Sequence, residues 1–183
     1  MDVHLVNPLS LELLISEEAI LSSIAGVCEN LDREYAGKEL VIVMVMKGAI
    51  CLVADLIRHL HVPCSIEFVQ GRSYGERGIQ RGELTVFGLD NFDVSNKDVL
   101  LVDDIYDSGY TLSAIYAKLQ AKQPSSLKTL VLLSKNVPRQ VVFQPDYVLF
   151  HIENRFVVGY GLDYKEHYRG LPGVYALNPS QEN

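Results

Sequence analysis

The segment with the most chemical potential is VLLVDDIYDSGYTLSAI, which spans residues 99–115. Three carboxylates, Asp103, Asp104 and Asp107, fall within five residues and follow an apolar run. Such crowding is tolerated when a cation or a set of hydroxyl donors neutralises the charge. A Mg²⁺ complex or a sugar diol is therefore a suitable ligand for this segment.

The second half of the same segment is suited to an anion. Ser108, Gly109 and Thr111 can offer hydroxyls and backbone N–H groups at the start of a helix, a geometry that binds phosphate. Taken together, the two halves predict a site for a ribose diol and its 5′-phosphate. The alternative is a solvated acidic turn in which Asp107 caps the helix.

Composition limits what else the chain can be. The 183 residues carry 16 Lys and Arg against 23 Asp and Glu, a formal charge of −7, and 48% are hydrophobic. We predict one soluble domain over residues 1–183. The acidic balance argues against binding nucleic acid.

The longest apolar run, residues 40–46, is far shorter than the roughly 20 residues that cross a bilayer. A secretory signal is not recognisable either. We therefore expect no membrane partner and a cytoplasmic location.

Hydrophobic periodicity predicts the elements that position the acidic segment. Apolar residues spaced three or four apart indicate helices over residues 16–31, 50–60 and 111–121. Apolar runs indicate strands over residues 40–46, 64–69, 84–87, 99–102 and 127–133. Continuously apolar strands that alternate with helices favour an α/β fold, with a mostly parallel twisted sheet flanked by helices. Ligands of such sheets bind past the carboxyl ends of the strands, where Asp103 and Asp104 are expected to emerge.

One region departs from this alternation. Residues 71–82, GRSYGERGIQRG, hold four glycines and three arginines without an apolar face. This composition predicts a long mobile loop. A plain solvated excursion between antiparallel strands is the other interpretation.

The acidic segment resembles the phosphoribosyl-pyrophosphate-binding motif of the type I phosphoribosyltransferases. That motif is an apolar strand, two acidic residues, two apolar residues, Asp, a small hydroxyl residue, Gly, any residue and Thr; Asp103 stands where the family commonly has Glu. The remaining landmarks are similar to those of hypoxanthine-guanine phosphoribosyltransferases, and they run from Met46 to Arg169. The resemblance implies the type I phosphoribosyltransferase fold, with a small hood formed by the N- and C-terminal segments.

The resemblance also implies a role for each matched residue. The phosphoribosyl group would contact Asp103, Asp104, Asp107, Ser108, Gly109, Tyr110 and Thr111, with Asp107 as the catalytic base. Pyrophosphate would contact Lys47, Gly48 and Arg169, in a loop where the family has a cis peptide bond before the Lys. The purine would contact Lys135, Phe156, Val157 and Asp163. The ligands of Mg²⁺ would be Asp103, Asp104 and Asp163, and the loop that closes over the site would hold Ser73 and Tyr74.

The implied reaction is transfer of 5-phosphoribosyl from phosphoribosyl pyrophosphate to N9 of a 6-oxopurine, hypoxanthine and also guanine, to give IMP or GMP and pyrophosphate. Lys135 has donors and no acceptor, so it favours a 6-oxo group over the amino group of adenine. The family commonly forms dimers or tetramers, which implies a homo-oligomer.

Two other classes of protein remain open. A phosphoacceptor signalling domain also places acidic residues and Mg²⁺ at a strand end, but it needs a separate Asp to accept the phosphoryl group. A non-catalytic regulator could use the phosphoribosyl pocket alone. Lys135, Phe156 and Asp163 disfavour the regulator, because it has no use for residues that face a base.

Overall fold

The computed structural model describes residues 10–73, 84–139 and 141–178. Its central sheet has six strands in the order β4-β3-β2-β5-β6-β7. The strands are β2 (Leu40–Val45), β3 (Cys64–Ser73), β4 (Leu84–Phe87), β5 (Asp98–Tyr106), β6 (Ser126–Lys135) and β7 (Tyr147–Ile152). All run parallel except β4, which pairs antiparallel with β3. The predicted α/β fold is confirmed.

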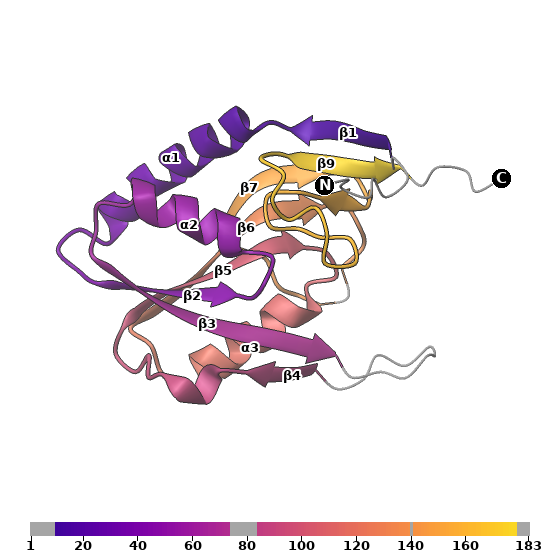
Figure 1. Ribbon diagram of the computed structural model, residues 1–183. Helices are drawn as coiled ribbons and strands as arrows, with labels where there is room; N and C mark the ends of the chain where they lie inside the picture. The colour runs from indigo at the N-terminus through magenta and orange to yellow at the C-terminus, as the bar shows by residue number, and fades with distance from the viewer. Residues whose placement is uncertain (1–9, 74–83, 140, 179–183) are drawn as a thin grey trace, which may run out of the picture.

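Helices cover both faces of this sheet (Figure 1). Helices α1 (Glu17–Glu34) and α2 (Ile50–His59) pack on one face, and α3 (Tyr110–Gln120) packs on the other. A single turn of 3-10 helix, Leu89–Asn91, follows β4. Successive side chains of each central strand point to opposite faces of the sheet, so they pack alternately into the two cores. Ile42 belongs to the core under α1 and α2, whereas Val41 and Val43 belong to the core under α3.

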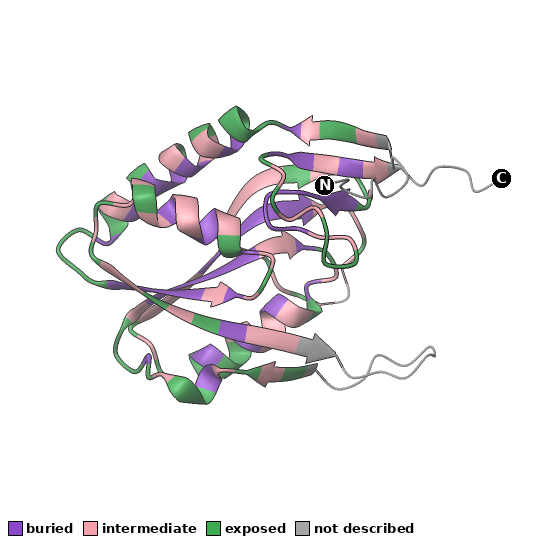
Figure 2. Cartoon of the chain, viewed as in Figure 1, coloured by how far each residue is buried: buried purple, intermediate pink, exposed green. Residues whose placement is uncertain are grey.

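Burial explains why the central strands read as apolar runs. Figure 2 shows the buried residues concentrated in the middle strands and on the inner sides of the helices. Strands β2, β5 and β6 are buried on both faces, so neither face tolerates polar side chains along most of their length.

In the part of the chain that the structure describes, no helix has both the length and the apolar character needed to span a bilayer.

A second, smaller sheet forms the hood that the family resemblance implies. It consists of β1 (Ser10–Ile15), β9 (Val174–Asn178) and β8 (Val157–Val158), paired antiparallel in that order. The two ends of the described chain therefore lie side by side, with Leu11 opposite Leu177. In Figure 1 the hood lies over the end of the central sheet toward which its parallel strands point.

Two predicted boundaries are wrong in an informative way. Strand β5 continues to Tyr106, so Asp103 and Asp104 lie within the strand and do not emerge after it. The apolar run stops at Asp103, but the backbone ladder with β6 continues, because ladder hydrogen bonds do not depend on side-chain polarity. Likewise β3 extends through Ser73, so the first three residues of the predicted loop pair with β4. The other residues of that loop, 74–82, lie outside the described ranges.

Candidate active site

A pocket of about 360 Å³ lies at the carboxyl ends of β2 and β5, the edge at which open parallel sheets bind ligands. Six predicted phosphoribosyl contacts line it: Asp103, Asp104, Asp107, Ser108, Gly109 and Thr111. So do Lys47, Gly48, Asp163 and Arg169. The predicted contact Tyr110 does not line the pocket, and its side chain is exposed at the start of α3.

The acidic pair sits in the pocket wall under electrostatic strain. Asp103 is buried, and its Oδ1 accepts a hydrogen bond from the backbone N–H of Asp104 at 2.9 Å. Burial, reinforced by the neighbouring Asp104 charge, raises the pKa of Asp103 well above its usual value. Burial also raises the pKa of Asp104, although Arg169 opposes this shift. Two adjacent carboxylates that are costly to ionise are suited to a ligand that brings positive charge or hydroxyl donors.

The turn after β5 leaves backbone N–H groups available to an anion. Helix α3 begins at Tyr110, and Gly109 at its N-terminus has a left-handed conformation with φ +79°. A Cβ there would lie 2.7 Å from the Tyr106 ring, so both the conformation and the space require glycine. No side chain caps this helix, which is a correction to the alternative in which Asp107 does so. The free N–H groups of the first turn, with the helix dipole, favour a phosphate.

The loop after β2 lies directly against the acidic pair. The peptide bond between Met46 and Lys47 is cis. A Cβ on Gly48 would lie 1.6 Å from Oδ2 of Asp104, and a Cβ on Gly161 would lie 2.0 Å from the backbone carbonyl oxygen of Gly48. Three segments far apart in sequence therefore meet here, and the close approach favours glycine at positions 48 and 161.

The two predicted pyrophosphate-binding cations are held by carboxylates. Lys47 Nζ lies 3.0 Å from Glu166 Oε1, and Arg169 Nη2 lies 3.0 Å from Glu166 Oε2. Arg169 also contacts Asp163 at 2.8 Å and donates to the carbonyl oxygen of Gly161 at 2.8 Å. The hydrogen bond from Lys47, followed by that from Arg169, lowers the pKa of Glu166. Sequence reasoning missed Glu166, although its place three residues before Arg169 was a usable signal.

The three predicted metal ligands share one pocket without forming a cage. Asp163 is engaged by Arg169 and by the backbone N–H of Glu166, whose nitrogen lies 2.9 Å from Asp163 Oδ2. Within the described ranges, no group of three or more His, Cys, Asp or Glu side chains is arranged to hold a metal ion. Asp103 and Asp104 thus form the acidic wall, and Asp163 belongs to the cationic cluster opposite.

Of the residues predicted to face the purine, Asp163 lines this pocket and Lys135 contacts the pocket residue Asp107. Lys135 ends β6, and its Nζ lies 3.3 Å from Oδ2 of Asp107. Val157 is buried in β8, whereas the Phe156 ring is half-exposed and lies nearly perpendicular to the Tyr164 ring, with 5.7 Å between the two centroids. The structure therefore brings Lys135 to Asp107 and leaves about half of Phe156 exposed.

Two sequence predictions are not tested by these positions. Ser73 ends β3, but its side chain is outside the described part of the structure, and Tyr74 is outside it altogether. A further residue, Arg139, contacts both the Asp107 turn and the end of β6, and sequence reasoning missed it. Its partners are mostly backbone carbonyls, which leave no mark in the sequence.

Comparison with known proteins identifies the family. The phosphoribosyl transferase domain model matches residues 12–165. The hypoxanthine-guanine phosphoribosyltransferase of Aquifex aeolicus is 39% identical over 168 residues, which cover 91% of this chain and 94% of that protein. The bifunctional protein TilS/HprT of Listeria innocua is 38% identical, and the chain spans only 26% of its length.

Solved structures agree with the sequence matches. The hypoxanthine phosphoribosyltransferase of Trypanosoma cruzi, in complex with the product IMP, aligns with a TM-score of 0.85 and 36% identity over 92% of this chain and 94% of that one. A structure from Bacillus anthracis, a hypoxanthine-guanine phosphoribosyltransferase, aligns with a TM-score of 0.80 and 33% identity, over 91% of this chain and 97% of that one. This chain therefore belongs to the phosphoribosyltransferase family and, within it, to the group of hypoxanthine-guanine phosphoribosyltransferases.

Proposed function

We propose that this chain transfers the 5-phosphoribosyl group of phosphoribosyl pyrophosphate to N9 of hypoxanthine or guanine, forming IMP or GMP and releasing pyrophosphate. The observation that carries the proposal is one pocket in which an acidic pair, an uncapped helix start and two cations face a common space. These groups match the alcohols, the 5′-phosphate and the pyrophosphate of the sugar substrate. The identity of the base rests on the relatives, whose names specify hypoxanthine and guanine.

Each part of the pocket has a distinct task in the reaction. Asp103 and Asp104 hold the ribose hydroxyls and stabilise the positive charge that develops on the ribose ring. The backbone N–H groups at the start of α3 bind the 5′-phosphate. Lys47 and Arg169 face the leaving pyrophosphate, for which the guanidinium fork is well matched.

The base end of the site needs a group that accepts a proton from the purine. Asp107 is the candidate, because its carboxylate is half-exposed and within reach of Lys135 at 3.3 Å. The Lys135 ammonium donates to the 6-oxo group, and Phe156 stacks on the ring. The backbone of Val157 meets the base edge, next to Asp163.

The donor set fits Mg²⁺ that binds together with the substrate. Mg²⁺ is usually held by one or two carboxylates, with waters and substrate phosphates completing its octahedral shell, so a preformed cage is unnecessary. Asp103 and Asp104 would supply the carboxylates, and Asp163 would become a ligand on exchanging its bond to Arg169. When bound, the ion would neutralise charge on the leaving pyrophosphate.

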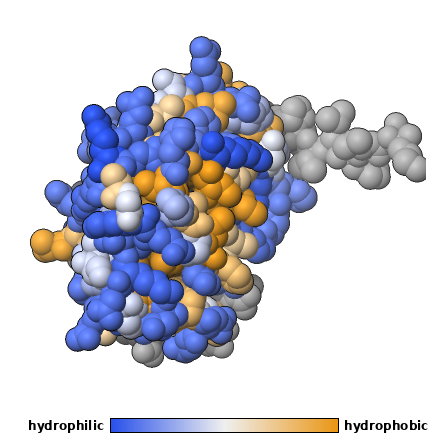
Figure 3. Space-filling model, turned by 90° about the vertical axis from the view of Figure 1, so that its left-hand side faces the viewer, coloured by the Kyte–Doolittle hydropathy of each residue, from blue (hydrophilic) through white to orange (hydrophobic). Residues whose placement is uncertain are grey.

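We further propose that residues 1–183 form one domain of a cytoplasmic homo-oligomer. An apolar area ringed by polar side chains is visible on one face of the molecule (Figure 3). Ile66, Phe68 and Phe87 on β3 and β4 are exposed, and such side chains commonly mark protein contacts. Light scattering during gel filtration measures the mass directly, and a monomer at micromolar concentration would contradict the proposal.

A spectrophotometric assay with phosphoribosyl pyrophosphate, Mg²⁺ and each of hypoxanthine, guanine, xanthine and adenine tests the reaction. We expect nucleotide formation with hypoxanthine and guanine and very little with adenine. Absence of IMP formation would favour the non-catalytic regulator. Appreciable use of adenine would contradict the role of Lys135.

The Asp107→Asn variant tests the catalytic base. We expect kcat to fall by about 10²–10⁴-fold, the usual contribution of a general base, while phosphoribosyl pyrophosphate still binds. Asp93→Asn is a matched control, because Asp93 is exposed and contacts Ser95 away from the pocket. An unchanged kcat would remove Asp107 from the chemistry.

A further inference from the structure

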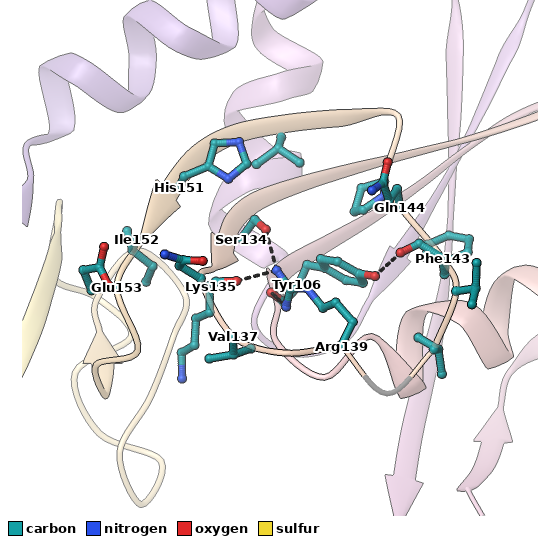
Figure 4. Close-up of a pocket in the computed structure, with 15 residues that line it drawn as sticks. Tyr106, Ser134, Lys135, Val137, Arg139, Phe143, Gln144, His151, Ile152 and Glu153 are labelled. Atoms are coloured by element: carbon teal, nitrogen blue, oxygen red, sulfur yellow. Dashed lines mark hydrogen bonds between the residues drawn. The ribbon is translucent and has the colours of Figure 1, made fainter.

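Arg139 connects the ends of the two strands that carry the base-facing residues. Its Nη1 donates to the carbonyl oxygens of Tyr106, at 3.1 Å, and Asp107. Its Nη2 donates to Ser134 Oγ, at 2.9 Å, and to the carbonyl oxygen of Lys135. The guanidinium also stacks on the Tyr106 ring, with 4.3 Å between its central carbon and the ring centroid. Figure 4 shows this side chain between the two strand ends.

These contacts fall where the sheet stops holding the two strands together. The last paired residues of β5 and β6 are Tyr106 and Ser134. Asp107 is the first residue after β5, and Lys135 is the last residue of β6, where it pairs with Ile152 of β7 and no longer with β5. Arg139 bonds to the backbone carbonyls on both sides of that point, so it fixes the two main chains relative to each other.

We propose that Arg139 is a positioning residue that sets the placement of Asp107 against Lys135, and through this pair determines productive binding of the 6-oxopurine. The inference rests on the proposed function. The two reactive side chains, 3.3 Å apart, project from the carbonyl-anchored residues, so a shift of either backbone moves a group that must meet the base. Only a planar guanidinium offers enough fixed donors for four acceptors, whereas an ammonium has three and no fork.

If Arg139 had a purely structural role, its loss would affect activity through the fold of the neighbouring loop. Tyr106 also anchors residues 141–146 before β7, because its hydroxyl donates to the carbonyl oxygen of Phe143. That loop, β7 and the ends of β5 and β6 line an open pocket of about 980 Å³ (Figure 4). If Arg139 merely kept this loop folded, Tyr106→Phe would disturb activity in the same way, since it removes the loop anchor and leaves the ring beneath the guanidinium.

The test compares three single variants: Arg139→Gln, Tyr106→Phe and the surface control Arg33→Gln. Arg139→Gln is also combined with Lys135→Met. Arg139→Gln is expected to lower kcat/KM for hypoxanthine by about 10- to 100-fold, the usual cost of a misplacement near 1 Å. Tyr106→Phe and Arg33→Gln should change it by less than about threefold. In the Lys135→Met background the Arg139→Gln loss should shrink to a small fraction of its value, because coupled residues are not additive.

Three results would overturn the inference. The first is a kcat/KM for hypoxanthine of Arg139→Gln within about threefold of the parent value. The second is a loss of kcat/KM in Tyr106→Phe equal to that in Arg139→Gln. The third is an Arg139→Gln loss that is as large in the Lys135→Met background as in the parent. Should Arg139→Gln fail to fold, Arg139→Lys keeps the charge and is expected to show the same loss, and an active Arg139→Lys would refute the need for the fork. Because the parent is assayed first, a parent that makes no IMP refutes the proposed function, whereas an active parent with an unaffected Arg139→Gln variant refutes only this inference.

Discussion

The contact between Gly48 and Asp104 offers a severe test of the site, through the Gly48→Ala substitution. The added Cβ would lie 1.6 Å from Oδ2 and 2.3 Å from Cγ of Asp104. Ordinary contact begins at 3.4 Å, so the carboxylate oxygen would have to retreat by about 1.8 Å, the difference between the two distances. The backbone of the Gly48 loop cannot give way instead, because Gly161 packs against the Gly48 carbonyl on its other side.

The displacement sets the size of the expected effect. A misplacement of about 1 Å can cost 10²-fold in rate, so we expect kcat/KM for phosphoribosyl pyrophosphate to fall by at least about 10²-fold, or roughly 2.7 kcal/mol of transition-state stabilisation. Initial rates of IMP formation at saturating hypoxanthine, with the sugar substrate varied, measure this. The matched control is Gly26→Ala in α1, where a Cβ meets nothing within 4 Å. A Gly48→Ala variant within threefold of the parent would show that the Asp104 position is not critical.

Three further predictions concern stability and charge. Gly26→Ala should leave activity unchanged and raise Tm by about 2 °C, since alanine stabilises a helix interior by roughly 0.5–1 kcal/mol over glycine, and a lower Tm in a thermal scan would contradict this. Hydrogen bonds from Lys128 and then Tyr147 lower the pKa of Glu34, so this carboxylate stabilises the fold above its unfolded pKa and ceases to do so as pH falls. Glu34→Gln should therefore cost about 0.5 kcal/mol at pH 7 in urea unfolding, and the difference should vanish near pH 3; a constant difference would refute the assignment. Glu166→Gln removes the anion held by Lys47 and Arg169, so Kd for pyrophosphate in calorimetry should fall by about two- to fivefold, and weaker binding would instead mean that Glu166 orients the two cations.

The middle strands of the central sheet, β2, β5 and β6, could be predicted because they are buried on both faces. Strands β2 and β6 leave a continuous apolar run that can be recognised without knowing any partner. Strand β7 has a comparable run, YVLF, and could have been found in the same way. The hood strands differ, since β1 exposes Leu13 and pairs with β9 at the other end of the chain, so local pattern does not identify them.

The residues of the candidate site likewise fall into those that the sequence predicts and those that it does not. The acidic pair, the turn at Gly109, Lys47 and Arg169 were predicted to act together, and they line one pocket. Their signal is strong because each is a chemical group with a recognisable neighbourhood in the sequence. Arg139 has no such signal, because three of its hydrogen bonds end on backbone oxygens, whose positions depend on the folded chain.

The way the hood is attached explains how a distant segment supplies residues to the sheet edge. Tyr160 is buried, and its hydroxyl donates to Asp55 Oδ2 on α2 at 2.5 Å. The next residue, Gly161, lies against the Gly48 carbonyl and accepts a hydrogen bond from Arg169. Helix α2 begins just after the Gly48 loop, so the hood is fixed to the same segment that approaches Asp104. The backbone N–H of Gly161 also donates to the carbonyl oxygen of Arg169 at 2.9 Å. This backbone bond places Arg169 relative to the acidic pair, so its side-chain ion pairs can exchange for a bound anion without releasing the hood.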